Sequence, residues 1–174
     1  MIFVTVGSQM AFDRLINVVD LWAGKIGRTD VFAQIGPSDF RPRHVEWTRE
    51  LKPVEFRERM LGATAIVAHA GMGTILTALE FGKPILVMPR HGDLQETRND
   101  HQIATARQFE KQGRVAVAYD EDSLIAKLDG LKHLKAGRQI DRLASPELLE
   151  RVRSFCGLAM NDQFHEPPWG TKRV

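Results

Sequence analysis

The fold is decided by the stretch Ala65-Ile66-Val67-Ala68-His69-Ala70-Gly71-Met72-Gly73-Thr74-Ile75-Leu76. Its first four residues form a short apolar run typical of a buried strand, and a turn with two glycines follows. From about Thr74 to Phe81 the pattern is helical. A strand that passes through a tight turn into a helix is the repeating unit of α/β proteins.

The same alternation extends along most of the chain. Further strands are expected at residues 2–6, 31–35, 44–51, 85–88 and 115–119, and helices at 12–22, from Pro53 onward, at 99–111 and at 123–131. Strands alternating with helices predict an α/β fold with a Rossmann-like, doubly wound, mostly parallel sheet. Ligands of such sheets bind beyond the carboxyl ends of the strands, which singles out the loops after Val6, Ala68 and Met88.

The length of 174 residues is enough for one domain with a core. We expect this domain over residues 1–132, and a C-terminal helix and tail over residues 133–174. That extension contains apolar residues at helical spacing, namely Leu143, Leu148, Leu149, Val152 and Phe155, and basic residues lie between them. Such a helix would contact a partner or anionic lipid, or pack back on its own sheet. The tail from Asn161, with Pro167-Pro168-Trp169-Gly170, is expected to be irregular.

Composition excludes several classes of protein. The net charge of +2 does not favour nucleic-acid binding. No apolar run approaches the ~20 residues needed to span a bilayer, and the start of the chain resembles a strand more than a signal peptide. The single cysteine precludes an internal disulfide, so a cytoplasmic location is expected.

The glycine turn is a candidate anion site. Glycines let the backbone approach a ligand, and the free amides and dipole of a helix start attract negative charge. Thr74 would cap the helix or donate its hydroxyl to a phosphate, and His69 would donate from the strand end. A tight structural turn with a structural histidine explains the same residues equally well.

Spacing over a longer range resembles a known family. The pattern His69-x-Gly71-x-x-Thr74 is followed by Gly82-x-Pro84, by Met88-Pro89-Arg90 and by Arg98-Asn99-Asp100-His101-Gln102. These motifs resemble the donor site of GT-B glycosyltransferases, and in particular the glycosyltransferase family 28 C-terminal domain. Within it, the chain most resembles the small catalytic subunits of two-component bacterial polysaccharide glycosyltransferases of the glucuronosyl or galactosyl type. These are related to the small subunit of the N-glycan UDP-GlcNAc transferase. The resemblance covers roughly residues 1–130.

The resemblance implies roles for individual residues. The donor's diphosphate would be held by Gly7, Ser8, His69, Gly71, Met72, Gly73 and Thr74. The donor sugar would meet Asn99, Asp100, His101 and Gln102. Arg90 and Arg98 are further candidates, since arginine binds carboxylates in a bidentate manner, and they would favour UDP-glucuronic acid over a neutral UDP-hexose. A solvated loop is the alternative interpretation of these charges.

Ribose recognition is where the chain departs from the family. Many members carry glutamate at the position of Thr77, where it holds the ribose hydroxyls. Here Thr77 is neutral, and Glu80 follows one turn later on the same helix face. Both are candidates for the ribose site, although Glu80 also fits a solvated helix position.

A GT-B enzyme needs two Rossmann-like domains, and this chain resembles the donor half alone. The expected protein is a UDP-sugar-dependent hexosyltransferase subunit of exopolysaccharide synthesis, for example a β-1,4-glucuronosyltransferase, without cofactor or metal. Its partner would be a membrane-anchored subunit that presents a lipid-linked acceptor and supplies the catalytic base, which would keep this chain at the inner face of the membrane. The alternatives are a non-catalytic UDP-sugar-binding regulatory subunit and a dinucleotide-dependent enzyme. The loop Val6-Gly7-Ser8-Gln9 lacks the three-glycine fingerprint of the latter.

Overall fold

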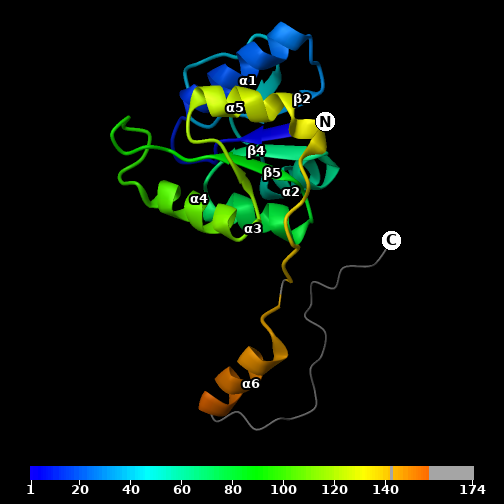
Figure 1. Ribbon diagram of the computed structural model, residues 1–174, viewed down its shortest axis with the longest axis vertical. Helices are drawn as coiled ribbons and strands as arrows, with labels where there is room; N and C mark the ends of the chain where they lie inside the picture. Colours follow the sequence, from blue (N-terminus) through cyan, green and yellow to red (C-terminus); the bar gives the residue numbers. More distant parts are fainter. Residues whose placement is uncertain (142, 157–174) are drawn as a thin grey trace. The chain divides into compact units, whose positions relative to one another are not determined.

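The structure, a computed structural model, describes residues 1–141 and 143–156. Six parallel strands form one sheet in the order β3-β2-β1-β4-β5-β6 (Figure 1). The strands are β1 (Ile2–Thr5), β2 (Val31–Gln34), β3 (Glu46–Thr48), β4 (Ala65–His69), β5 (Ile85–Met88) and β6 (Ala116–Val117). The helices are α1 (Asp13–Ile26), α2 (Pro53–Gly62), α3 (Met72–Glu80), α4 (His101–Lys111), α5 (Glu121–Asp129), the 3₁₀ turn η1 (Leu131–His133) and α6 (Pro146–Phe155). The expected Rossmann-like parallel α/β fold is confirmed.

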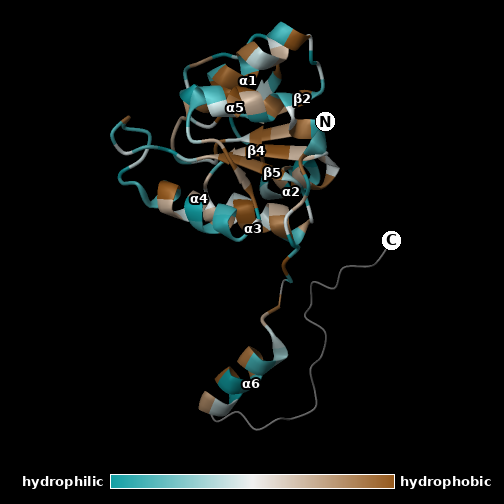
Figure 2. Ribbon diagram, viewed as in Figure 1, coloured by the Kyte–Doolittle hydropathy of each residue, from teal (hydrophilic) through white to brown (hydrophobic). Residues whose placement is uncertain are grey.

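The strands β1, β2, β4 and β5 bury side chains on both faces, as expected for a sheet covered by helices on two sides. On one face Val4, Val67 and Leu86 pack with α1 and α5, and on the other Phe3 and Ile66 pack with α2, α3 and α4. This alternation follows the two-residue period of a strand. Apolar residues accordingly concentrate in the sheet and on the inner faces of the helices (Figure 2).

The strand order places a topological switch point between β1 and β4. From β1 the chain proceeds outward to β2 and β3, whereas from β4 it proceeds outward to β5 and β6. The crossovers therefore leave the two central strands in opposite directions, and their carboxyl ends open a crevice between the loops that follow them. The glycine turn after β4 and the loop after β1 both lie at this crevice.

The edge strand β3 is shorter than expected, with three residues in place of 44–51. The buried carboxylate of Asp20 accepts hydrogen bonds from the amides of Arg43, His44 and Val45 at 2.7–3.2 Å. These amides are therefore turned toward α1 and do not continue the strand. Pro53 then begins α2, which limits extension at the other end.

Several helices start one or two residues from the expected position, and α3 and α4 are the two that follow candidate site loops. α3 begins at Met72, two residues before the expected start, with Gly71 as its N-cap. α4 begins at His101, two residues after the expected start, because Asn99 and Asp100 use their side chains in local hydrogen bonds. The earlier start of α3 adds the amides of Met72 and Gly73 to its first turn.

Contacts divide the chain after Ile140. The second unit contains α6, so the expected C-terminal helix is present; Ser145 caps it by accepting a hydrogen bond from the amide of Leu148 at 3.3 Å. Its contact with a partner or lipid stays a prediction, as does the domain boundary at residue 132. The expected irregular tail from Asn161 lies outside the described residues. Within the described residues, no helix has the length and apolarity required to cross a bilayer.

Candidate functional site

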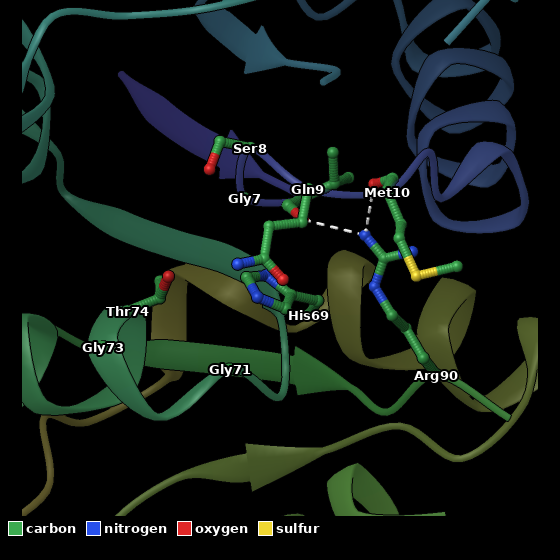
Figure 3. Close-up of a pocket in the computed structure, with 10 residues that line it drawn as sticks. Gly7, Ser8, Gln9, Met10, His69, Gly71, Gly73, Thr74 and Arg90 are labelled. Atoms are coloured by element: carbon green, nitrogen blue, oxygen red, sulfur yellow. Dashed lines mark hydrogen bonds between the residues drawn. The ribbon is translucent and has the colours of Figure 1, made fainter. Parts of the chain in front are cut away.

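A cavity of about 320 Å³ lies at the switch point (Figure 3). Its walls come from three strand ends: the loop after β1, the glycine turn after β4 and the residue that follows Pro89 after β5. The ten lining residues are Val6, Gly7, Ser8, Gln9, Met10, His69, Gly71, Gly73, Thr74 and Arg90. The fold therefore brings together Gly7, Ser8, His69, Gly71, Gly73 and Thr74, which the sequence predicted as one site.

The loop after β1 needs a glycine at its first position. Gly7 has a φ of +75°, a left-handed conformation that disfavours other residues, and its amide donates to the hydroxyl of Thr5 at 3.2 Å. Thr5 in turn donates to the side chain of Gln34 at 2.6 Å. These buried polar contacts join β1, β2 and the loop, which holds the first wall of the cavity in place.

The imidazole of His69 lies between two glycines. A Cβ added at Gly71 would lie 2.1 Å from its Nε2, and one added at Gly7 would lie 3.0 Å from its Cε1. Nδ1 is 3.4 Å from the carbonyl oxygen of Thr5, so the proton of a neutral ring belongs on Nδ1. Burial, helped by the charge of Arg90, lowers the pKa of His69 to about 4. The ring is thus neutral at pH 7, and Nε2 is an acceptor.

This geometry changes the expected role of His69. Donation from Nε2 to a phosphate requires a second proton on the ring, and burial disfavours that proton in the free protein. The neutral ring is positioned as a wall of the cavity. Donation of a hydrogen bond by His69 to an anion stays a prediction that depends on proton uptake.

The start of α3 presents free donors to the cavity. No side chain caps this helix, and the first helical bond runs from the amide of Ile75 to the carbonyl of Gly71. The amides of Met72, Gly73 and Thr74 therefore have no partner among the described residues, and the helix dipole adds positive potential there. Such a terminus is suited to an oxyanion.

Thr74 does not cap the helix, contrary to one of its two expected roles, because it occupies the third helical position. Its side chain is buried, lines the cavity, and forms no hydrogen bond with the described residues. The hydroxyl is thus available to a ligand, which fits its other expected role. Met72 is 48% exposed and does not line the cavity, so only its backbone amide is placed to contribute.

A second cavity, of about 420 Å³, adjoins the first. The two share Gly7, Ser8, Gly73 and Thr74 in their walls. The rest of the second cavity is lined by Gln34, Leu51, Pro53, Phe56, Arg57 and Thr77. It is more apolar than the first, and the edge of Phe56 packs against Phe3 with ring centroids 5.6 Å apart. Of these residues only Thr77 was a candidate from the sequence. The other five were missed, because the strand order of the sheet is what brings α2 near the glycine turn.

The two ribose candidates lie in different surroundings. Thr77 lines the second cavity and donates its hydroxyl proton to the carbonyl of Gly73 at 2.8 Å, so its oxygen can only accept from a ligand. Glu80 lines neither cavity and pairs with Arg57 at 3.4 Å. Arg57 stacks on Phe81 at 4.7 Å and also lines the second cavity. Glu80 therefore positions Arg57 rather than standing as a solvated residue.

Arg90 is buried, with 3% of its surface exposed, and both terminal nitrogens of its guanidinium are engaged. One terminal nitrogen donates to the carbonyls of Val6 and Met10 at 2.8 and 2.7 Å, and the other to those of Ala11 and Glu96. Four terminal N–H groups therefore have four backbone acceptors. The expectation that Arg90 grips a sugar carboxylate in a bidentate manner does not fit this geometry.

The remaining sugar candidates do not line either cavity: Arg98, Asn99, Asp100, His101 and Gln102. The first four are exposed on the loop before α4 or at its start. Asp100 accepts from the amide of Gly92 at 2.8 Å, and Gln102 is buried and accepts from the amide of Arg90 at 3.2 Å. Their contact with a sugar stays a prediction. In the described part of the chain, no group of three or more His, Cys, Asp or Glu residues is arranged around a metal position.

The chain is similar to known proteins in both sequence and structure. A model of the glycosyltransferase family 28 C-terminal domain matches residues 1–142. The UDP-N-acetylglucosamine transferase subunit ALG13 of Yarrowia lipolytica is 26% identical over 169 residues, which cover 87% of this chain and 82% of that protein. The human subunit of the same name is 29% identical over 124 residues, or 66% of this chain, but these cover only 10% of its length.

Solved structures agree on the fold. The solution structure of ALG13 has a TM-score of 0.56 at 18% identity, covering 87% of this chain and 93% of that one. The glycosyltransferase of kitacinnamycin has the same TM-score at 19% identity, covering 88% of this chain and 37% of that one. Together with the family match over residues 1–142, the Rossmann-like sheet and its switch-point cavity show that this chain belongs to the glycosyltransferase family 28 C-terminal domain family.

Proposed function

We propose that this chain is the donor-binding catalytic subunit of an inverting glycosyltransferase that uses a UDP-sugar. The observation that carries the proposal is the pair of joined cavities at the switch point. The first combines a glycine loop, free helix-start amides and an unengaged hydroxyl, which suit a diphosphate. The second, with Phe56 and Leu51 in its walls, suits the flat and partly apolar nucleoside.

The reaction would be a single displacement at the anomeric carbon of the donor sugar. A hydroxyl oxygen of the acceptor forms the new bond while the bond from the anomeric carbon to the phosphate oxygen breaks, and the electron pair leaves with UDP. The amides at the start of α3 would stabilise the negative charge of that leaving group. A base outside this chain would accept the hydroxyl proton.

The acceptor half of the enzyme would come from a membrane-anchored partner subunit that presents a polyprenyl-diphosphate-linked acceptor. This division is supported by the family, since the ALG13 relatives are described as subunits of a UDP-N-acetylglucosamine transferase. By this proposal the chain acts at the inner face of the membrane in polysaccharide synthesis, with a hexose or hexuronic acid as the transferred group. Arg98, exposed on the loop before α4, is the candidate that would favour a hexuronic acid.

Binding is the first test. Calorimetry on the full chain should detect UDP and no comparable affinity for NAD. Thr74→Val removes the free hydroxyl and should weaken UDP binding about threefold to tenfold, in line with the loss of one hydrogen bond. Thr64→Val is the matched control, because Thr64 lies at the amino end of β4 and bonds the carbonyl of Met1. Tighter binding of NAD than of UDP would refute the proposal.

Transfer is the second test. The chain would be co-expressed with the product of the neighbouring gene, and UDP-glucuronate, UDP-galactose, UDP-glucose and UDP-GlcNAc would be offered with a polyprenyl-diphosphate-sugar acceptor. Transfer that requires both chains would support the catalytic proposal. UDP binding without transfer from any donor would instead favour a non-catalytic regulatory subunit. Preference for UDP-glucuronate that Arg98→Gln abolishes would support the hexuronic acid, and equal use of a neutral donor would exclude it.

A further inference from the structure

The cavity at the switch point contains one permanent charge. Of its ten lining residues, Arg90 alone is charged at neutral pH, because burial keeps His69 neutral. Burial, opposed by the nearby charges of Glu96 and Asp13, lowers the pKa of Arg90 to about 10, so the guanidinium stays protonated at pH 7. A ligand with two phosphates would therefore meet a single cation at this site.

No carboxylate neutralises this cation at short range. The four hydrogen bonds of Arg90 all end on backbone carbonyls, and among the described residues it forms no ion pair within 4 Å. Isolated charges are costly to bury unless a counter-charge accompanies them. A buried guanidinium that is bonded only to neutral groups, at the wall of a cavity, is arranged for an anion that binds in that cavity.

The same side chain also shapes the loop that would meet the anion. Three of its acceptors, on Val6, Met10 and Ala11, bracket the cavity-lining segment Gly7–Met10. The guanidinium lies 4.7 Å from the ring centre of Phe12 and is fixed at the end of β5 through the bond from its amide to Gln102. Figure 3 shows the side chain rising from the strand end to the loop. Arg90 thereby joins the first and third walls of the cavity.

We propose that Arg90 is a positioning residue for the diphosphate of the donor, which holds the loop at residues 7–11 in shape and balances the phosphate charge, and is not a ligand of the donor sugar. This inference rests on the proposed function for the identity of the ligand. It assigns Arg90 to the phosphates, in contrast to the sugar contact expected from the sequence. Its effect should therefore scale with the number of phosphate charges and not with the sugar.

Arg14 provides a matched control within the same cluster. Its guanidinium lies 5.4 Å from the ring centre of the same Phe12, but it pairs with Glu96 through bonds of 2.7 and 2.9 Å and with Glu121 at 3.4 Å. It also donates to the carbonyl of Pro89. Arg14 therefore resembles Arg90 in its packing and loop contacts, while its charge is already compensated and it does not line the cavity.

The experiment measures the affinity of the full chain for uridine, UDP and inorganic pyrophosphate by calorimetry. In Arg90→Met, the affinities for UDP and for pyrophosphate should fall roughly 3- to 100-fold, which is the effect of one charge about 6 Å from a phosphate at effective dielectric constants of about 80 to 20. Binding of uridine should change by less than about twofold. Arg90→Lys should retain part of the pyrophosphate affinity, since it keeps the charge but loses the four-bond geometry.

Arg14→Gln should lower stability while changing the affinity for the three ligands by one common small factor. If Arg90→Met does not fold, Arg90→Lys is used for the test. A loss of affinity for UDP that exceeds the loss of affinity for uridine then supports the inference. Equal losses for uridine and UDP, or unchanged UDP binding, would overturn it. The two proposals can also fail separately. If pyrophosphate binding depends on Arg90 but the chain binds UDP no more tightly than pyrophosphate, the anion role is supported and the proposed nucleotide function is refuted.

Discussion

Gly71→Ala should show that the fold itself requires a glycine beside His69, independently of any ligand. Gly71 has φ −82° and ψ 130°, a conformation that alanine adopts without strain. Its added Cβ would nevertheless lie 2.1 Å from Nε2 of His69 and 2.8 Å from Cδ2 and Cε1. Retreat of the ring is limited by Gly7 on its other side. Forced overpacking of this kind destabilises by about 1–3 kcal/mol.

Gly73→Ala is the matched substitution two residues later. An added Cβ there would meet nothing within 4 Å, and the residue is already inside α3. Alanine in a helix is more stable than glycine by about 0.5–1 kcal/mol. The two alanine variants should therefore differ in unfolding free energy by roughly 1.5–4 kcal/mol, although each adds one methyl to the same turn.

Urea unfolding, followed by circular dichroism with unchanged m-values, measures this difference. The decisive addition is the double variant with His69→Ala, since removal of the ring should make Gly71→Ala nearly neutral. If Gly71→Ala destabilised the protein equally with and without the ring, the contact would not be the cause and the reasoning would fail. Calorimetry completes the design: Gly73→Ala should fold well yet weaken UDP binding if phosphates approach this backbone.

Three further predictions follow from other contacts. The pKa of His69 is about 4 in the folded protein, below its ordinary value of 6.5, so stability should be complete above pH 6.5 and fall as the pH drops toward 4, by up to about 3 kcal/mol. His69→Gln should flatten that dependence in urea titrations, and stability that rises on acidification would contradict it. Asp20→Asn should destabilise by about 1–3 kcal/mol because three amides of residues 43–45 share one carboxylate, whereas Asp39→Asn, at a fully exposed position, should have little effect on the urea midpoint. Thr77→Val should weaken UDP binding about threefold to tenfold and leave pyrophosphate binding unchanged. Equal losses of affinity for the two ligands in calorimetry would place this hydroxyl outside the ribose site.

Local patterns predicted the part of the site that is built from local structure. The segment from Ala65 to Thr74 combines an apolar run, two glycines and a helix start, and each of these features depends on residues within one or two turns. The structure places His69, Gly71, Gly73 and Thr74 of this segment in one cavity wall. The expected loop after Val6 also joins that cavity, because parallel strands end at a common edge of the sheet.

Features that depend on distant residues were not visible in the sequence. The bonds of Arg90 to Val6, Met10 and Ala11 cross 79 to 84 residues, and no spacing rule links a side chain to backbone carbonyls at that separation. The shortening of β3 has the same origin, since the carboxylate of Asp20 is 23 to 25 residues away from the amides it binds. The second cavity required the sheet order itself, which places Phe56 near the glycine turn.

The two halves of the expected donor site differ in how well contacts within the chain hold them in place. On the phosphate side, Arg90 joins the loop after β1 to the end of β5, across β4 in the sheet. On the sugar side, residues 98–101 are exposed and line neither cavity. Preorganisation reduces the free energy lost on binding, so under the proposed function this chain alone would favour the nucleotide over the sugar. Sugar selection would then depend on contacts that form when the acceptor half of the enzyme closes over the loop before α4.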